Sequence, residues 1–199
     1  MDMVSPNPVN YRRPNESLHG GSVEVRATVG DFWAWSASDL VANTTRGLLA
    51  EYIVGVALDA VQHPRQEWAA WDLTTPSGAK VEVKSAAFLQ GWEQRKPSDI
   101  RFRIPKTLTW SDEIGYSETE PKWQADVYVF ALLAEIDRML LDPLNLDQWE
   151  FYVVATSLLE AKVPTAKSLS LATLRGFRKG VRFEELKAAV KLASPTGVR

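Results

Sequence analysis

The chain lacks cysteine and has only two histidines, His19 and His63, among its 199 residues. The absence of cysteine excludes disulfide bonds and thiolate metal sites, and it is compatible with a reducing compartment. The two histidines are isolated in the sequence, so nothing indicates a histidine catalyst or a zinc site. The sequence also contains no phosphate-binding Gly-Lys-Ser/Thr loop and no dinucleotide fingerprint, so no nucleotide site of either kind is predicted.

Long apolar runs and a large excess of one charge are missing as well. No secretory signal or membrane-spanning stretch is present, so we expect a soluble, cytoplasmic protein without a membrane partner. The net charge is only −2, which by itself does not indicate nucleic acid. Residues 110–160 hold 2 basic and 11 acidic side chains, whereas residues 161–199 hold 9 basic and 2 acidic. This asymmetry fits either a polyanion-binding face or a basic tail that packs against the acidic middle.

The length and composition predict one globular unit of the α/β class. Residues 1–24 are poor in apolar side chains and are expected to form a flexible N-terminal arm. Residues 25–199 are then long enough for a single domain with its own core. The order of the expected elements gives a mixed β-sheet flanked by helices.

Hydrophobic periodicity places these elements along the chain. Apolar residues at three-to-four spacing predict a helix over 48–61, capped by Asn43 or Thr44 and stopped before Pro64. Strands are predicted over 100–104, 126–133 and 149–155, and the last two have the composition of buried central strands. Residues 106–124 are expected to form a long loop or an insertion, and helical spacing predicts a closing helix over 183–192.

The most informative stretch covers residues 67–85. Valines at 81 and 83 alternate with the charged residues 80, 82 and 84, which predicts a strand with a charged face. Residues 67–74, rich in Trp and small apolar side chains, predict the partner strand. A two-residue loop would place Asp72 on the wrong face. A three-residue loop over 76–78, with Gly78 in the left-handed conformation, instead places Asp72 directly opposite Glu82.

Two facing carboxylates repel each other unless a cation lies between them. With Lys84 on the same face, they would form a divalent-metal site suited to phosphodiester cleavage. The Glu-x-Lys pattern alone is weak, because it also occurs at 160–162 and 185–187. Only the first copy lies on an alternating strand with an aspartate across from it. The alternative is an exposed sheet face whose charges form ordinary cross-strand pairs.

The pattern resembles the PD-(D/E)XK nuclease superfamily, which has the restriction-endonuclease-like fold. The resemblance rests on the helical element Gly47-x-x-x-Glu51, on the hairpin with Asp72 and the strand 81–85, and on the apolar strand 126–133. It covers roughly residues 44–135, and residues 149–199 would be a C-terminal extension. Trp71 stands where the family pattern has proline, a variation that the superfamily tolerates.

The resemblance implies a role for each matched residue. Asp72 and Glu82 would ligate Mg²⁺ (or Mn²⁺) together with the Val83 carbonyl and waters. Glu51 would reach the site from the helix, directly or through water. Lys84 would orient the attacking water, help to deprotonate it and stabilise the transition state. All four side chains are expected to meet in one open cleft.

Several further residues are candidates for nucleic-acid binding, each with a structural alternative. Gln90 follows Lys84 at a distance at which some superfamily members have a glutamine, although a surface position explains it equally simply. Five basic residues within 95–106 could contact phosphate or form a solvated face: Arg95, Lys96, Arg101, Arg103 and Lys106. Trp92 and Trp110 could stack on bases, or pack in the core or under a lid.

The sequence therefore predicts a Mg²⁺-dependent nuclease with DNA as its expected substrate. The main alternative is a catalytically inactive module of the same fold that binds DNA or a protein partner. A third alternative is an α/β interaction protein without a role on nucleic acid, which the near-neutral charge favours slightly. Many such nucleases act as homodimers, but the sequence shows no self-association surface.

Overall fold

Four strands pair into a mixed sheet in the order β1-β2-β6-β7. They are β1 (Leu73–Thr74), β2 (Lys80–Ala87), β6 (Val127–Leu133) and β7 (Trp149–Ala155). Strands β2 and β6 run parallel, whereas β1 is antiparallel to β2 and β7 is antiparallel to β6. The computed structural model describes residues 9–21, 23, 25–67, 69–108, 110–111, 115–116 and 120–195. The predicted class, one α/β domain with a mixed sheet flanked by helices, is confirmed.

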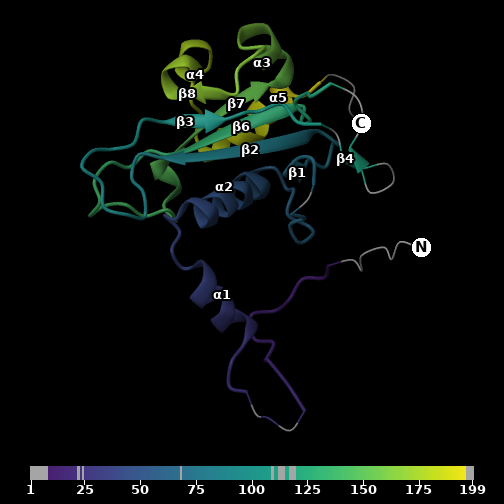
Figure 1. Cartoon of the computed structure of the whole chain (residues 1–199), viewed down its shortest axis with the longest axis vertical. Coiled ribbons are helices and arrows are strands. Elements are labelled where there is room, and N and C mark those ends of the chain that lie inside the picture. The colour runs from purple at the N-terminus through teal and green to yellow at the C-terminus, as the bar shows by residue number, and fades with distance from the viewer. Residues whose placement is uncertain are drawn as a thin grey trace.

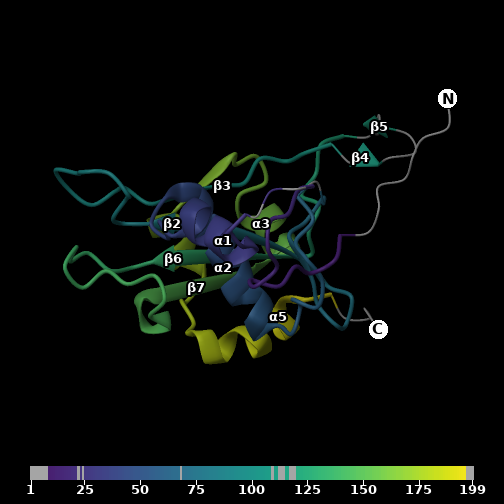
Figure 2. The ribbon, with the colours of Figure 1, turned by 90° about the horizontal axis from the view of Figure 1, so that it is seen from below.

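Helices and smaller strands cover both faces of this sheet. One face carries α2 (Asn43–Ala57) and α5 (Leu186–Ala193), and the other carries β3 (Arg101–Arg103), α3 (Thr156–Lys162), β8 (Ser168–Ser170) and α4 (Leu171–Phe177). Helix α1 (Val29–Ala37) lies beyond α2, on the side away from the strands (Figures 1 and 2). The remaining elements are β4 (Trp110–Ser111), β5 (Gly115–Tyr116), η1 (Leu146–Gln148) and η2 (Phe183–Glu185).

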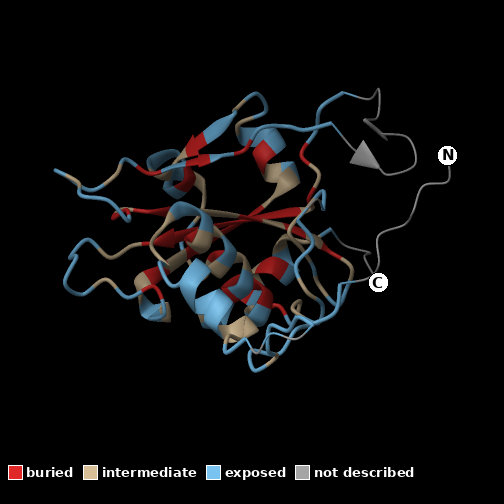
Figure 3. Cartoon of the chain, turned by 60° about the horizontal axis from the view of Figure 1, so that its bottom comes forward, coloured by how far each residue is buried: buried red, intermediate tan, exposed pale blue. Residues whose placement is uncertain are grey.

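The core lies on both sides of the sheet, and the strands form its most buried region (Figure 3). All seven residues of β6 are buried, as expected for a central strand. Val81 and Val83 of β2 pack on the side of α2 and α5, whereas Tyr128 and Phe130 of β6 face β3, α3 and α4. Because side chains alternate along a strand, Glu82 and Lys84 project on the same side as Tyr128 and Phe130.

Helix α2 differs from the prediction at both ends. Its N-cap is Ala42, which makes no side-chain capping bond, because Asn43 lies inside the helix and accepts a hydrogen bond from Arg46. The helix ends at Ala57 rather than continuing to 61. Asp59 adopts a left-handed conformation with φ of 54°, a common way to terminate a helix. The predicted apolar stripe was also too wide, since the side chains of three of its members are exposed: Leu48, Tyr52 and Val56.

Two predicted strands also differ from the structure. The partner strand expected over 67–74 is only Leu73–Thr74, because the chain bends at residues 70–72, where Asp72 keeps one main-chain hydrogen bond to the Val81 carbonyl. The strand expected over 100–104 is the shorter β3, which pairs with β8 in a separate two-stranded sheet. Residues 106–124 are not a plain loop, since they contain the β4–β5 pair and a bridge between Thr107 and Lys122. The helices α3 and α4 and strand β8 were not predicted.

The described part of the N-terminal arm lies on the surface. Residues 9–21 are almost all exposed, and the Tyr11 hydroxyl donates a hydrogen bond to the Val61 carbonyl at 2.5 Å. Residues 1–8, 22 and 24 of the predicted arm lie outside the described residues, so its boundary stays a prediction. No helix in the described part of the chain has the length and apolar character needed to cross a membrane.

Candidate active site

The hairpin between β1 and β2 has the predicted register. Leu73 pairs with Val81, Thr75 donates to the Ala79 carbonyl at 2.9 Å, and Gly78 donates to the Thr75 carbonyl at 2.8 Å. Gly78 has φ of 88°, the left-handed conformation that a glycine adopts without steric cost. The three-residue loop is therefore confirmed. The predicted pairing of Asp72 with Glu82 stays a prediction, because the observed ladder pairs are Leu73–Val81 and Thr74–Lys80, and the Asp72 N–H donates to the Val81 carbonyl at 3.1 Å.

Asp72 directly precedes β1, and its side chain accepts a hydrogen bond from β2 that a main-chain carbonyl would otherwise accept. Its Oδ2 accepts a hydrogen bond from the Val83 N–H at 2.7 Å. In the register of this hairpin, a longer β1 would present a main-chain carbonyl to that N–H. The carboxylate thus lies at the edge of the sheet beside β2, where side chains from both faces can approach it.

Glu82 and Lys84 project from β2 on the same face. The Lys84 Nζ donates to Glu82 Oε1 at 2.5 Å, and the side chains are 31% and 17% exposed for Lys84 and Glu82 respectively. Both charges are therefore partly shielded from solvent but accessible. On the neighbouring strand, Tyr128 lies at the level of Glu82. Burial, and secondarily the charges of Glu82 and Asp72, raise the pKa of the Tyr128 hydroxyl.

Glu51 approaches the site from α2. Its carboxylate accepts two hydrogen bonds from Arg65, one of them from Nη2 at 3.1 Å, and its side chain is 15% exposed. The negative charge of Glu51 contributes to the raised pKa of Asp72, after burial and the charge of Glu82. Arg65 interacts electrostatically with both carboxylates.

Asp72 is the electrostatic centre of the cluster. Burial, then the charge of Glu82 and then that of Glu51, raise the pKa of Asp72 to about 7, against opposing effects of the Val83 N–H and Lys84. The negative charges of Glu82 and Glu51 thus both act on Asp72, and the positive charges near Asp72 offset this repulsion only in part. An added cation would relieve the repulsion that remains.

The donors present fit a hard divalent cation. Asp72 and Glu82 offer carboxylate oxygens, and the Val83 carbonyl points to the same strand edge as its N–H, toward Asp72. Among the described residues, no group of three or more acidic, histidine or cysteine side chains is arranged so that it could hold a metal ion. Mg²⁺ does not need such a group, because it usually keeps several waters and binds through one or two carboxylates.

The other predicted nucleic-acid contacts lie away from this cluster. Gln90 is buried. Its side-chain oxygen accepts a hydrogen bond from Arg46, and its side-chain NH₂ donates to the Ala87 carbonyl and to Ser98, so no group of Gln90 is free to contact DNA. Arg95 and Lys96 are exposed in the loop after β2. Arg101 and Arg103 are exposed on β3, where Phe102 packs inward against Phe130. They therefore point away from the sheet. A role in phosphate contact required them to continue the face of Glu82, and they do not.

The remaining basic and aromatic candidates for nucleic-acid binding are Lys106, Trp92 and Trp110. Lys106 is exposed, and its Nζ lies 4.8 Å from the centre of the Trp123 ring. Trp92 is 57% exposed and stays a candidate for stacking, whereas the side chain of Trp110 lies outside the described residues. The expected open cleft around the four site residues also stays a prediction, because the two pockets described below have other linings.

Sequence reasoning missed three residues that shape the site. Arg65 binds Glu51, and its place after Pro64 in a loop gave no indication of that pairing. Tyr128 stands beside Glu82 only because β2 pairs in parallel with β6, a long-range contact that periodicity does not reveal. Arg46 is 5% exposed and bonds Gln90 and Ser85 beneath the strand that carries Lys84. Its position one residue before Gly47 was the only available signal.

The raised pKa of Asp72 predicts an unusual dependence of stability on pH. Since the folded state holds the proton up to about pH 7 and the unfolded state loses it near 3.8, stability falls as pH rises across this window. Asp72→Asn should therefore be more stable than the wild type at pH 8, by about 1–3 kcal/mol, and the gain should shrink toward pH 5. Denaturant unfolding with chelator at both pH values measures this difference. The matched control is the exposed Asp99→Asn, and equal pH profiles for all three proteins would contradict the prediction.

Comparisons with known proteins add one finding. The family model described as bacteriophage T4 endonuclease IV matches residues 32–172. The match covers more than half of the chain and includes Glu51, Asp72, Glu82 and Lys84. A search among curated proteins gave no significant match.

Proposed function

The chain belongs to the bacteriophage T4 endonuclease IV family, and from this premise we propose that it is a nuclease that hydrolyses phosphodiester bonds of DNA with a divalent metal ion. The name of the family supplies the substrate class. The local pattern suggests the chemistry, because its resemblance to PD-(D/E)XK nucleases falls on Glu82 and Lys84, which form an ion pair on β2, and on Asp72 beside them.

The observation that carries the proposal is the convergence of Asp72, Glu82 and Glu51 beside Lys84. Such a cluster costs stability, as the raised pKa of Asp72 indicates. A surface that only binds a partner gains nothing from carboxylates that oppose one another. A metal-dependent hydrolase gains its metal ligands from the same arrangement.

Each residue has a distinct proposed task. Asp72 and Glu82 would hold Mg²⁺ or Mn²⁺ with the Val83 carbonyl, and Glu51 would support the ion or its waters. The bound ion would lower the pKa of a coordinated water and neutralise charge that develops on the phosphate. Lys84, fixed by its hydrogen bond to Glu82, would orient the attacking water and stabilise negative charge on the phosphoryl oxygens. Arg65 would hold the Glu51 carboxylate in place through its hydrogen bonds.

A cleavage assay tests the proposal directly. We expect the protein to cut DNA when Mg²⁺ or Mn²⁺ is present and to be inactive with chelator, with supercoiled plasmid, linear duplex and single-stranded DNA as parallel substrates. Glu82→Ala should abolish cleavage without loss of folding. Tight metal-independent binding without cutting on any substrate would instead identify a non-catalytic DNA-binding module. Absence of both binding and cleavage would favour an interaction protein.

Metal binding should also appear as stabilisation. A ligand that binds only the folded state at about 100 times its dissociation constant stabilises it by about 2.7 kcal/mol. We expect Mg²⁺ or Mn²⁺ to raise the melting temperature of the wild type at pH 8, and to raise it less at pH 6, because Asp72 is then largely protonated. Asp72→Asn should respond weakly at both values. An equal rise for Asp72→Asn and the wild type would place the ion elsewhere.

A further inference from the structure

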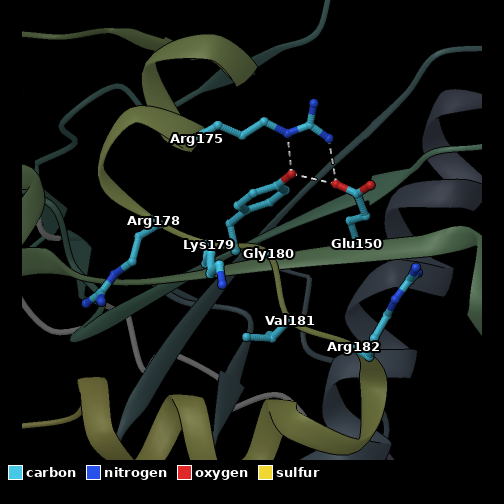
Figure 4. Close-up of a pocket in the computed structure, with 8 residues that line it drawn as sticks. Glu150, Arg175, Arg178, Lys179, Gly180, Val181 and Arg182 are labelled. Atoms are coloured by element: carbon cyan, nitrogen blue, oxygen red, sulfur yellow. Dashed lines mark hydrogen bonds and ion pairs between the residues drawn. The ribbon is translucent and has the colours of Figure 1, made fainter.

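A basic pocket lies beside β7, at the opposite edge of the sheet from β1. Its volume is about 420 Å³, and we call it the β7 pocket (Figure 4). Four cations line the pocket, namely Arg175, Arg178, Lys179 and Arg182, together with the carboxylate of Glu150. The other lining residues are Tyr152, Gly180 and Val181. The positive charge thus exceeds the negative charge by three.

Two of the four cations, Arg175 and Arg182, form hydrogen bonds within the protein. Arg175 donates to the Tyr152 hydroxyl and to the Glu150 carboxylate, both at 2.7 Å, which neutralises the acid of the pocket. Arg182 donates to the main-chain carbonyls of Asp147 and Trp149, at 2.9 Å and 3.2 Å. These bonds anchor the two arginines, so the walls of the pocket are held in place.

The other two cations, Arg178 and Lys179, have donors without a hydrogen-bond partner among the described residues. Lys179 is exposed and has no hydrogen-bond or ion-pair partner within the described part of the chain. The Nε of Arg178 is buried and lacks a hydrogen-bond partner among the described residues, whereas nearly all buried donors in proteins have one. A buried, unsatisfied guanidinium nitrogen is costly, and an anion that accepted its hydrogen bond would remove that cost.

Arg178 also connects this pocket with a second one of about 640 Å³. In Figure 4 its guanidinium points away from the Arg175–Glu150 pair, and it lines the second pocket together with Lys80 and Lys122. Lys80 belongs to β2 and lies two residues before Glu82, on the same face. Three cations and the Asp126 carboxylate, which accepts a hydrogen bond from the main-chain N–H of Lys80 at 2.9 Å, therefore line the surface between β2 and the β7 pocket.

We propose that the β7 pocket binds a backbone phosphate of the polynucleotide at a point away from the bond that is cut, with Arg178 and Lys179 as the contacts. This inference rests on the proposed nuclease function. Phosphate oxygens accept charge-assisted hydrogen bonds from guanidinium and ammonium groups, and the pocket has no free carboxylate to repel them. Across the sheet, Lys84, Phe130 and Tyr152 form one row, which spans about 10 Å at a strand spacing of ~4.8 Å.

The charge asymmetry of the sequence supports the same surface. The alternative was that the basic segment 161–199 is neutralised by the acidic middle of the chain. Among the described residues, the one ion pair that joins these segments is Arg175–Glu150. The charges of Arg178 and Lys179 therefore remain available to an external polyanion.

The test uses Arg178→Gln/Lys179→Gln and a control that removes the same charge elsewhere, Lys162→Gln/Lys167→Gln. Both control residues are exposed and line neither pocket. Binding of a labelled DNA oligonucleotide is followed by fluorescence anisotropy in chelator, at several salt concentrations. We expect the pocket variant to bind about 10-fold more weakly than the control, and the slope of log affinity against log salt to fall by about two. In Mg²⁺, its KM for DNA should rise while kcat stays unchanged.

Equal affinities and salt slopes for the pocket variant and its control would overturn the inference, as would the absence of DNA binding by the wild type. Arg178→Lys should restore part of the affinity if the charge at this position contacts phosphate. Should the loss of Arg178 impair folding, Lys179→Gln alone still has to weaken binding more than Lys162→Gln. The proposed function is judged separately, because Glu82→Ala must abolish cleavage while it leaves oligonucleotide binding in chelator intact.

Discussion

Lys84→Met is expected to reduce DNA cleavage about 10³-fold, whereas Lys162→Met leaves it unchanged. The loss of one preorganised group that stabilises transition-state charge typically costs 10²–10³ in rate, and Lys84 is also placed to orient the nucleophile. Methionine keeps the length and packing of the aliphatic chain but removes the ammonium group. Glu82 would retain its position for the metal, so the variant tests the lysine rather than the metal site.

The control exploits the repetition of Glu-x-Lys in this chain. Residues 160–162 carry the same pattern on the exposed surface of α3, without a facing aspartate. Initial rates on plasmid DNA, measured at saturating Mg²⁺ and with melting curves for both variants, give the comparison. Equal cleavage rates for the two variants would show that Lys84 does not contribute to catalysis. This result would contradict the proposed mechanism.

Arg46→Met is expected to have the largest effect on stability, a loss of about 3 kcal/mol. Arg46 is buried at the start of α2, and its guanidinium donates to Asn43 at 2.8 Å, to the Val41 carbonyl at 3.0 Å and to Gln90 at 3.3 Å. None of these partners is a carboxylate, and burial lowers the pKa of Arg46. Methionine would leave the buried Gln90 oxygen without this donor, at a cost of about 1–3 kcal/mol, and would also remove the hydrogen bonds to the less buried Val41 and Asn43.

Chemical denaturation and melting curves measure this effect. For a chain of this size, 3 kcal/mol corresponds to a fall in melting temperature of about 10 °C. Arg95→Met is the matched control, since Arg95 is exposed and has no comparable network. Unchanged or increased stability of Arg46→Met would mean that the desolvation cost of the buried cation outweighs its hydrogen bonds.

The local part of the site was predictable because it depends on short-range rules. The alternation around Glu82 and the composition of the loop at Gly78 determine the hairpin register, and only one loop length places Asp72 on the charged face. The buried strands β6 and β7 were equally visible, since their residues are nearly all apolar. Glu51 lies on α2 as expected, because the helix that carries it was recognised, and its role at the site stays a prediction.

What could not be predicted depends on contacts between distant segments. Nothing in the composition of residues 126–133 shows that they pair in parallel with β2, and this pairing puts Tyr128 beside Glu82. The interior position of Gln90 follows from its bond to Arg46, more than forty residues earlier in the chain. The exposed apolar side chains of α2 misled the helix prediction, because periodicity cannot tell how wide a stripe the sheet will cover.

The early end of β1 has a consequence for self-association. An unpaired strand edge is a template onto which a strand of another molecule can add, and proteins often guard such edges with a charge. The Asp72 carboxylate occupies the Val83 N–H, the point at which an incoming strand would begin to pair. The same side chain that would hold the metal therefore also guards the edge of the sheet against aggregation. Asp72→Ala should form aggregates more readily than Asp72→Asn, which keeps an acceptor for that N–H, as light scattering on concentrated samples would show.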